Sequence, residues 1–123
     1  MHRTGILLLA HGSRDPKWRE PFTAIEKLTR HEAQGPVLVC FLESMQPDFI
    51  TGVRELAAQS IDVIRVVPVF LAAGAHLRED LPKLIEQARG EFPKIAFDVL
   101  PAIGESAEIQ HSIAHYATHS SKA

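Results

Sequence analysis

The chain has 123 residues, which suits a single domain that buries its own hydrophobic core. Hydrophobic residues make up 46% and charged residues 23%, which is typical of a globular protein in water. The formal net charge is −2, so the composition gives no general attraction for nucleic acid or for an anionic membrane surface. We therefore expect one domain over residues 1–123, with no nucleic-acid or membrane partner.

Cys40 is the only cysteine, which excludes an intrachain disulfide and a Cys-x-x-Cys site. It stands within an apolar run and is expected to be a buried, unreactive thiol. The N-terminal run ILLLA is too short for a signal-peptide core, and the longest apolar run, VVPVFLAAGA, is about half of a membrane span. These features predict a cytoplasmic protein.

Four segments are rich in Val, Ile and Leu with little polar alternation, which is typical of strands covered on both faces in a parallel sheet. They are residues 5–10, 37–42, 63–69 and 95–100. Pro68 lies in the third segment and cannot donate a ladder hydrogen bond. Either the paired part of that strand ends near Val67, or a bulge lies there.

A helix-period apolar stripe follows each strand segment. The stripes are Trp18, Phe22, Ile25 and Leu28; Ile50, Val53, Leu56 and Ala57; Leu77, Leu81, Leu84, Ile85 and Ala88; and Ile109, Ile113 and Tyr116. Asp15 suits the N-cap of the first helix and Pro47 can open the second, whereas Pro82 must lie in the first turn of the third. The order βαβαβαβα predicts a three-layer α/β domain with a four-stranded, mainly parallel sheet.

Polar side chains follow the predicted strands at the edge where open α/β sheets bind ligands. His11 and Glu43 come directly after the first and second strands, and His76 follows the third. Two imidazoles and a carboxylate suit a divalent ion such as cobalt, nickel, iron or zinc, and a neutral imidazole can also accept a proton. Either histidine alone is more often a hydrogen-bonded loop residue, so the combination with Glu43 is what favours a site.

The neighbours of these residues suggest how a ligand could be held. Small residues at 72–75 would let a large flat ligand approach the backbone, although they are equally typical of a flexible loop. Arg14 and Arg78 can meet ligand carboxylates through charge-assisted hydrogen bonds, although a solvated surface position is the usual one for arginine. Asp80 suits the start of a helix.

In the last predicted helix, His111, His115 and His119 recur every four residues, opposite Ile109 and Ile113. They could bind a metal as an i, i+4 pair, line a dimer contact or simply remain solvated, which is the commonest case. We place no catalysis there.

Three segments resemble the CbiX family of small class II chelatases, which includes the SirB sirohydrochlorin chelatases. The segments are LLLAHGSRDPKWREPF, FLESMQPDF and VVPVFLAAGAHLREDLP. The family inserts a divalent metal, typically cobalt, into sirohydrochlorin during cobalamin synthesis, and some relatives insert iron or nickel. The resemblance therefore implies a sirohydrochlorin cobaltochelatase with a chelatase-like fold.

By position, the resemblance implies that His11 and His76 are the two active-site histidines and that Glu43 is the acidic residue near the metal. Which histidine accepts protons and which binds the metal stays open. The residues expected to contact the tetrapyrrole are Ser13, Arg14, Gly74 and Arg78. No permanent cofactor is implied, since Co²⁺ (or Ni²⁺ or Fe²⁺) and the tetrapyrrole are substrates. Longer members contain two such halves, so this single unit is expected to work as a homodimer.

Two other classes of protein stay open. A non-catalytic metal-binding or tetrapyrrole-binding protein would use the same ligands, but it would hold its metal tightly without inserting it. A phosphoryl-transfer enzyme is suggested by the His-Gly turn after a strand, because helix N-termini favour anions. Histidine phosphatases, however, carry arginine immediately before the histidine, where this chain has Ala10.

Overall fold

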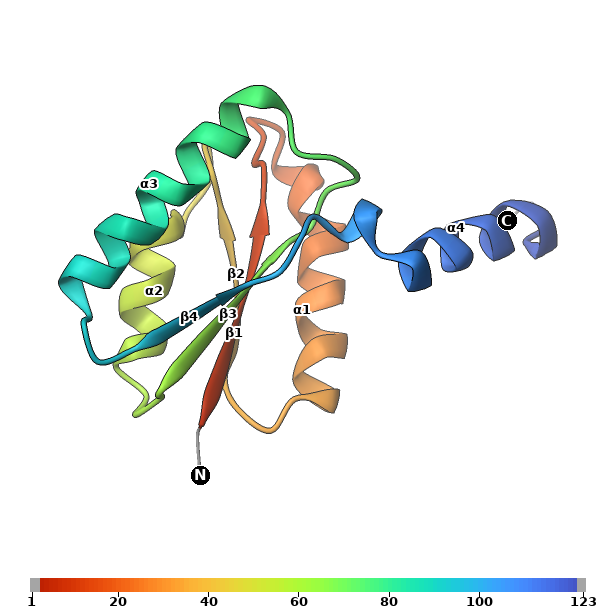
Figure 1. Cartoon of the computed structure of the whole chain (residues 1–123). Coiled ribbons are helices and arrows are strands. Elements are labelled where there is room, and N and C mark those ends of the chain that lie inside the picture. The colour runs from red at the N-terminus through yellow and green to blue at the C-terminus, as the bar shows by residue number, and fades with distance from the viewer. Residues whose placement is uncertain (1–2, 122–123) are drawn as a thin grey trace.

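A computed structural model describes residues 3–121, which form a parallel four-stranded sheet flanked by helices (Figure 1). The strands are β1 (Thr4–Ala10), β2 (Val37–Phe41), β3 (Val63–Pro68) and β4 (Ala96–Val99). They are arranged in the order β2-β1-β3-β4, and every neighbouring pair is parallel. The predicted α/β class and the parallel four-stranded sheet are confirmed.

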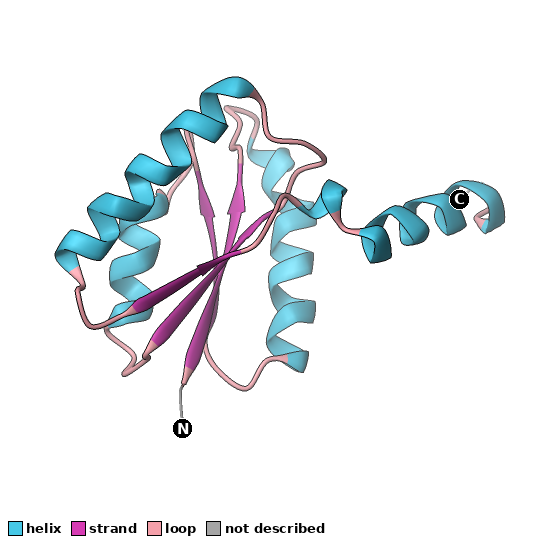
Figure 2. Ribbon diagram, viewed as in Figure 1, coloured by secondary structure: helices cyan, strands magenta, loops and turns pink. Residues whose placement is uncertain are grey.

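Helices cover the sheet unequally. They are η1 (Pro16–Arg19), α1 (Glu20–Glu32), α2 (Phe49–Ala57), α3 (Ala75–Glu91), η2 (Ile103–Glu105) and α4 (Ala107–His119). The α1 helix lies on one face of the sheet and α2 and α3 lie on the other, whereas α4 projects away from the body (Figure 2). Among the described residues, no helix combines the length and apolar character that crossing a membrane requires.

Two apolar clusters fill the spaces on either side of the sheet. Beneath α2 and α3, strand residues such as Leu7 and Ile64 pack against Val53 and Leu56, all of them fully buried. On the opposite face, Trp18 and Phe22 pack against the buried residues Leu8, Ala10, Val37, Val39 and Phe41. The central strand β1 is therefore covered on both faces along most of its length, which explains its continuous apolar run, whereas β3 exposes Arg65.

Pro68 ends β3 without a bulge, which settles the alternative raised by its position. The N–H of Val69 still donates to the carbonyl oxygen of Leu9 at 2.7 Å. Because successive N–H groups of a strand point to opposite sides, the missing donor of Pro68 would face β4. On that side the Leu100 N–H donates to the Val66 oxygen at 2.9 Å, and the ladder between β3 and β4 ends there because Pro68 has no N–H for the next hydrogen bond.

The expected position of Pro82 in the first turn is wrong. The α3 helix already begins at Ala75, after Gly74 as N-cap, so Pro82 lies inside it. Its ring nitrogen cannot donate to the carbonyl of Arg78, which leaves that carbonyl without its usual helical partner. The helix start lies earlier than predicted because Ala75, one of the small residues before His76, is already helical.

The other helix starts follow capping chemistry. The Asp15 side chain accepts a hydrogen bond from the Lys17 N–H at 3.0 Å and caps η1, which leads into α1. The second helix begins at Phe49 rather than at Pro47, because Asp48 is its N-cap and accepts from the Thr51 N–H at 2.9 Å.

Candidate functional site

The carboxyl ends of β1 and β2 are held together where His11 and Glu43 leave the sheet. The N–H of Leu42 donates to the oxygen of Ala10 at 2.9 Å, and the N–H of Glu43 donates to the oxygen of His11 at 3.0 Å. Gly12 makes this approach possible because it has φ +94°, and a Cβ at this position would overlap the Glu43 carbonyl oxygen. The glycine of the His-Gly turn therefore places the imidazole beside the carboxylate segment.

A cavity of about 650 Å³ opens beside these strand ends and the first turns of α3. It is lined by His11, Leu42, Glu43, His76, Leu77, Asp80, Lys83, Leu84 and Gln87. The three residues predicted from separate strand ends thus line one cavity, and each is exposed to solvent. Within residues 3–121, no three His, Cys, Asp or Glu side chains form a group that could hold a metal ion. Because His11, Glu43 and His76 are all exposed, the cavity is open to solvent.

An aromatic contact supports the first histidine. The ring centroids of His11 and Phe70 lie 4.8 Å apart, and the two rings are tilted by 41°. Phe70 is itself only 9% exposed and packs with Leu77 and Ala102, so the imidazole rests on a fixed surface. Sequence reasoning gave Phe70 no role, although an aromatic residue directly after a strand end was the available signal.

One face of α3 forms a wall of the cavity. His76, Asp80, Lys83 and Gln87 are spaced by four, three and four residues, so they lie along the same side of the helix. Asp80 is of a type that suits a helix start, but it lies one turn beyond His76 within α3 and lines the cavity. Helical spacing counted from His76 would have identified these polar residues once the helix start was known.

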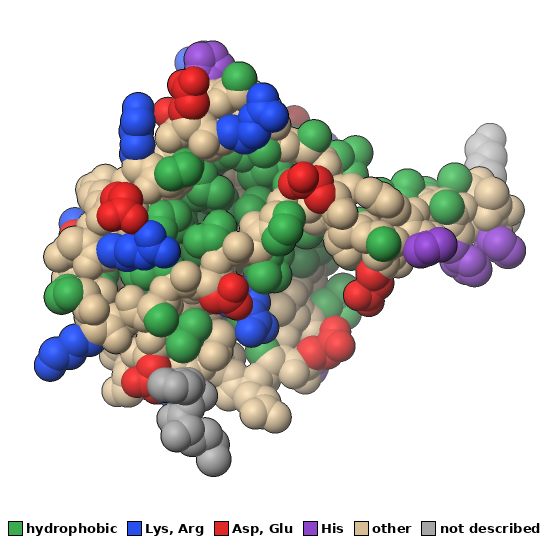
Figure 3. Space-filling model, viewed as in Figure 1, with side chains coloured by type: hydrophobic (Ala, Val, Ile, Leu, Met, Phe, Trp, Pro, Cys, Tyr) green, Lys and Arg blue, Asp and Glu red, His purple; other side chains and the backbone are tan. Residues whose placement is uncertain are grey.

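The residues expected to contact the tetrapyrrole do not line this cavity. The Ser13 hydroxyl accepts a hydrogen bond from the Asp15 N–H at 3.1 Å, and Arg14 is exposed. Gly74 is the N-cap of α3, and a Cβ there would meet no atom within 4 Å, so its backbone is open to solvent. Arg78 lines a separate apolar groove of about 410 Å³ between α3 and the β4 segment, visible as a hydrophobic hollow in Figure 3.

The histidines of α4 are remote from the cavity and line none of its walls. His side chains gather on one side of α4 and hydrophobic side chains on the other (Figure 3). The rings of His115 and His119 are stacked, with centroids 4.2 Å apart. In the described part of the chain these histidines form no three-residue metal group.

Sequence comparison identifies relatives with named activities. The CbiX family matches residues 5–119. The sirohydrochlorin cobaltochelatase of Methanothermobacter thermautotrophicus is 40% identical over 83 residues, which cover 68% of this chain and 58% of the relative. The sirohydrochlorin cobaltochelatase of Sulfurisphaera tokodaii is 35% identical over 86 residues, covering 70% of this chain and 71% of that protein. The match thus spans between about half and three quarters of these relatives.

Solved structures agree over nearly the whole chain. A CbiX protein of Marinobacter aquaeolei superposes with a TM-score of 0.82 at 32% identity, and the match covers 93% of both chains. SirB of Bacillus subtilis subspecies spizizenii, solved in complex with cobalt, gives a TM-score of 0.81 at 28% identity. That match covers 94% of this chain and 50% of SirB. In sequence and in fold, the chain belongs to the CbiX family.

Proposed function

We propose that the protein is a sirohydrochlorin cobaltochelatase, which inserts Co²⁺ into the tetrapyrrole during cobalamin biosynthesis. The observation that carries the proposal is the cavity shared by His11 and Glu43, which follow two strand ends, and by His76 from the first turn of α3. The names of the relatives in Methanothermobacter and Sulfurisphaera support cobalt as the metal. Iron or nickel insertion by the same site is the alternative, since a relative from Bacillus subtilis is a sirohydrochlorin ferrochelatase.

The reaction exchanges one divalent ion for two protons. The macrocycle loses two pyrrole N–H protons, four pyrrole nitrogens bind the metal, and the ion sheds water or protein ligands, with no covalent enzyme intermediate. A neutral imidazole can hold the metal before transfer or accept a pyrrole proton, but one nitrogen lone pair cannot do both at once. His11 and His76 divide these duties, and Glu43 assists as ligand or proton acceptor.

The open form of the cavity supports transfer rather than storage. An ion in a closed four-ligand site would not be released, whereas exposed donors without a preformed three-residue cage hold it loosely. A volume of about 650 Å³ lies within the range of ligand-binding cavities. The ammonium of Lys83 in the cavity wall can meet a carboxylate of the substrate, which would orient the macrocycle.

Homodimerisation and a cytoplasmic location are parts of the same proposal. The chain corresponds to half of SirB in length, which supports the pairing of two such units in one assembly. A single cysteine, buried in β2, supports a reducing compartment.

The test is an absorbance assay of purified protein with sirohydrochlorin and each of Co²⁺, Ni²⁺ and Fe²⁺, corrected for spontaneous insertion. We expect the protein to accelerate insertion, with Co²⁺ giving the highest rate. Rates equal to spontaneous insertion for all three ions would contradict the proposal. Tight, slowly released metal without insertion would instead favour the non-catalytic binding protein.

A further inference from the structure

Glu43 stands on a short irregular segment, residues 42–48, between the end of β2 and the start of α2. The beginning of this segment is held by its two backbone hydrogen bonds to the His11 turn, described above. Further along, the N–H of Met45 donates only locally, to the Glu43 oxygen at 2.8 Å, and Gln46 is exposed. The position of the carboxylate therefore depends on what fixes the far end of the segment.

Arg19, the last residue of η1, contacts this segment on both sides of the carboxylate. On one side, its guanidinium carbon lies over the Phe41 ring, 4.6 Å from the centroid. On the other side, its Nη2 donates to the backbone oxygen of Gln46 at 2.7 Å. Among the residues that the structure describes, no other hydrogen bond ties positions 44–46 to a distant part of the chain. One arginine thus holds the backbone before and after Glu43.

The aromatic ring beneath the guanidinium is itself fixed. Phe41 is fully buried, and the centroids of the Trp18 and Phe22 rings each lie 6.4 Å from its own. Trp18 precedes Arg19 in η1, so the same element supplies the arginine and packs against the ring that carries it. Close packing of this kind leaves a buried ring little freedom to shift. A fixed ring therefore gives the guanidinium a fixed place.

The contact requires the particular chemistry of arginine. A guanidinium is planar and always charged, so it can lie on an aromatic face while its N–H groups donate in the plane of the group. A hydrogen bond from a charged donor is also stronger than one between neutral groups. A lysine ammonium would keep the charge, but it has no plane to stack on Phe41 while it donates to Gln46.

We propose that Arg19 is a positioning residue, which holds the Glu43 segment against the His11 turn and thereby raises the affinity of the cavity for the divalent ion. Arg19 does not line the cavity, so it acts through the backbone of the segment and not on the ion itself. The inference rests on the proposed function, since it takes Glu43 as a ligand of the metal substrate. Residues that orient a metal ligand typically change metal affinity or activity by about 10–100-fold.

The test measures Co²⁺ binding by calorimetry in the absence of tetrapyrrole. We expect Arg19→Gln to raise the dissociation constant for Co²⁺ by about 10-fold or more, and Arg19→Lys to raise it as well, because neither side chain can stack and donate together. Circular dichroism and urea denaturation should show both variants folded. An unchanged dissociation constant in Arg19→Gln would overturn the inference. Full affinity in Arg19→Lys would overturn it too, because charge alone would then be sufficient.

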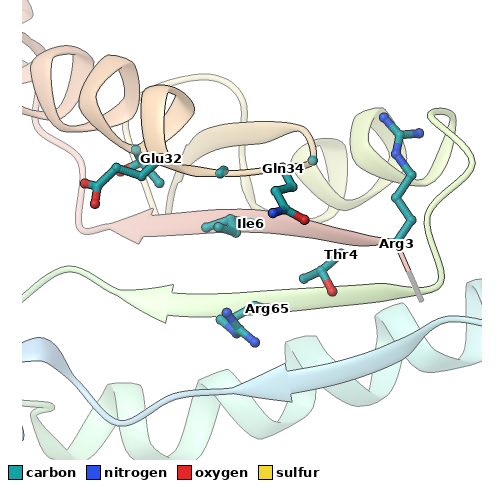
Figure 4. Close-up of a pocket in the computed structure, with 9 residues that line it drawn as sticks. Arg3, Thr4, Ile6, Glu32, Gln34 and Arg65 are labelled. Atoms are coloured by element: carbon teal, nitrogen blue, oxygen red, sulfur yellow. The ribbon is translucent and has the colours of Figure 1, made fainter. Parts of the chain in front are cut away.

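Arg30→Gln is the matched control. Arg30 also donates to a backbone oxygen, that of Val37 at 3.0 Å, and it belongs to α1, which directly follows η1. The end of α1 borders a separate cavity of about 650 Å³, and Figure 4 shows Ile6 of β1 and Glu32 of α1 in its lining. None of the three site residues lines that cavity, so Co²⁺ affinity should not change. An equal loss of affinity in Arg30→Gln and Arg19→Gln would mean a general effect of losing an arginine, against the inference.

A double-mutant cycle tests whether Arg19 acts through Glu43. Glu43→Gln alone should weaken Co²⁺ binding, and Arg19→Gln added to it should weaken binding little further, because no carboxylate is left to position. Losses that multiply independently, or a Co²⁺ affinity that does not depend on Glu43, would overturn the inference. If the cycle behaves as expected but the unchanged protein inserts no metal, the chelatase function fails while the role of Arg19 in metal binding stands.

Discussion

One added methyl group at Gly12 should cost far more than the same group at Gly74. At Gly12, φ is +94° and a Cβ would overlap the Glu43 carbonyl oxygen. A non-glycine residue in the left-handed region costs about 1–2 kcal/mol. Moving the Glu43 segment away loosens its hydrogen bond to the His11 oxygen, which is worth about 1 kcal/mol. We expect Gly12→Ala to lower the free energy of unfolding by about 2–3 kcal/mol.

The assay is urea denaturation followed by circular dichroism, with Gly74→Ala as the matched control. Gly74 has φ −71° and no atom lies within 4 Å of an added Cβ, so its replacement should cost under about 1 kcal/mol. Chelatase turnover should also fall in Gly12→Ala, because His11 and Glu43 move apart. Equal unfolding free energies for the two variants would refute this explanation of the strand-end geometry.

Three further predictions concern the core, the thiol and a helix cap. Leu56→Ala should lower the free energy of unfolding by about 2–5 kcal/mol, because Leu56 is fully buried; a loss below about 1 kcal/mol in urea denaturation would contradict the packing. Burial raises the pKa of the Cys40 thiol, so a disulfide reagent should label it only after unfolding, and rapid labelling of the native protein would count against its burial. Hydrogen bonds from Thr51 lower the pKa of the Asp48 carboxyl below its ordinary value of 3.8. The ionised carboxylate therefore stabilises the folded protein above pH 3.8, and this stabilisation is lost as the pH falls through the lowered pKa. Thermal denaturation of Asp48→Ala should show that the free energy of unfolding falls by about 1 kcal/mol at pH 7 and by less in acid. A decrease that stays constant in acid would argue against the cap.

The architecture was predictable because buried parallel strands require continuous runs of Val, Ile and Leu, which are easily recognised in the sequence. The Val, Ile and Leu runs identified all four strands. Because ligands bind beyond the carboxyl ends of parallel strands, the sequence also predicted that His11, Glu43 and His76 meet at one edge of the sheet, and they line one cavity there. Helix boundaries were harder. The start of α3 was placed too late because Gly74 and its small neighbours are as typical of a loop as of a capped helix start.

The parts that could not be predicted depend on tertiary contacts. The contact of Phe70 with His11 joins two loops that lie far apart in the sequence. Asp80 and Lys83 could be assigned to the cavity only after the helix start had fixed which face of α3 meets the strands. Leu28 belongs to the apolar stripe that its spacing predicts, but it is 65% exposed in the folded chain.

The central claim is that His11 and His76 perform metal insertion together, and single substitutions test it most directly. His11→Ala and His76→Ala should each lower the protein-catalysed rate of Co²⁺ insertion into sirohydrochlorin by about 100-fold or more, with circular dichroism showing a native fold. His111→Ala, which removes an imidazole from the outer side of α4, should keep the intact rate. If both cavity variants insert cobalt as fast as the unchanged protein, these histidines are not the catalytic groups.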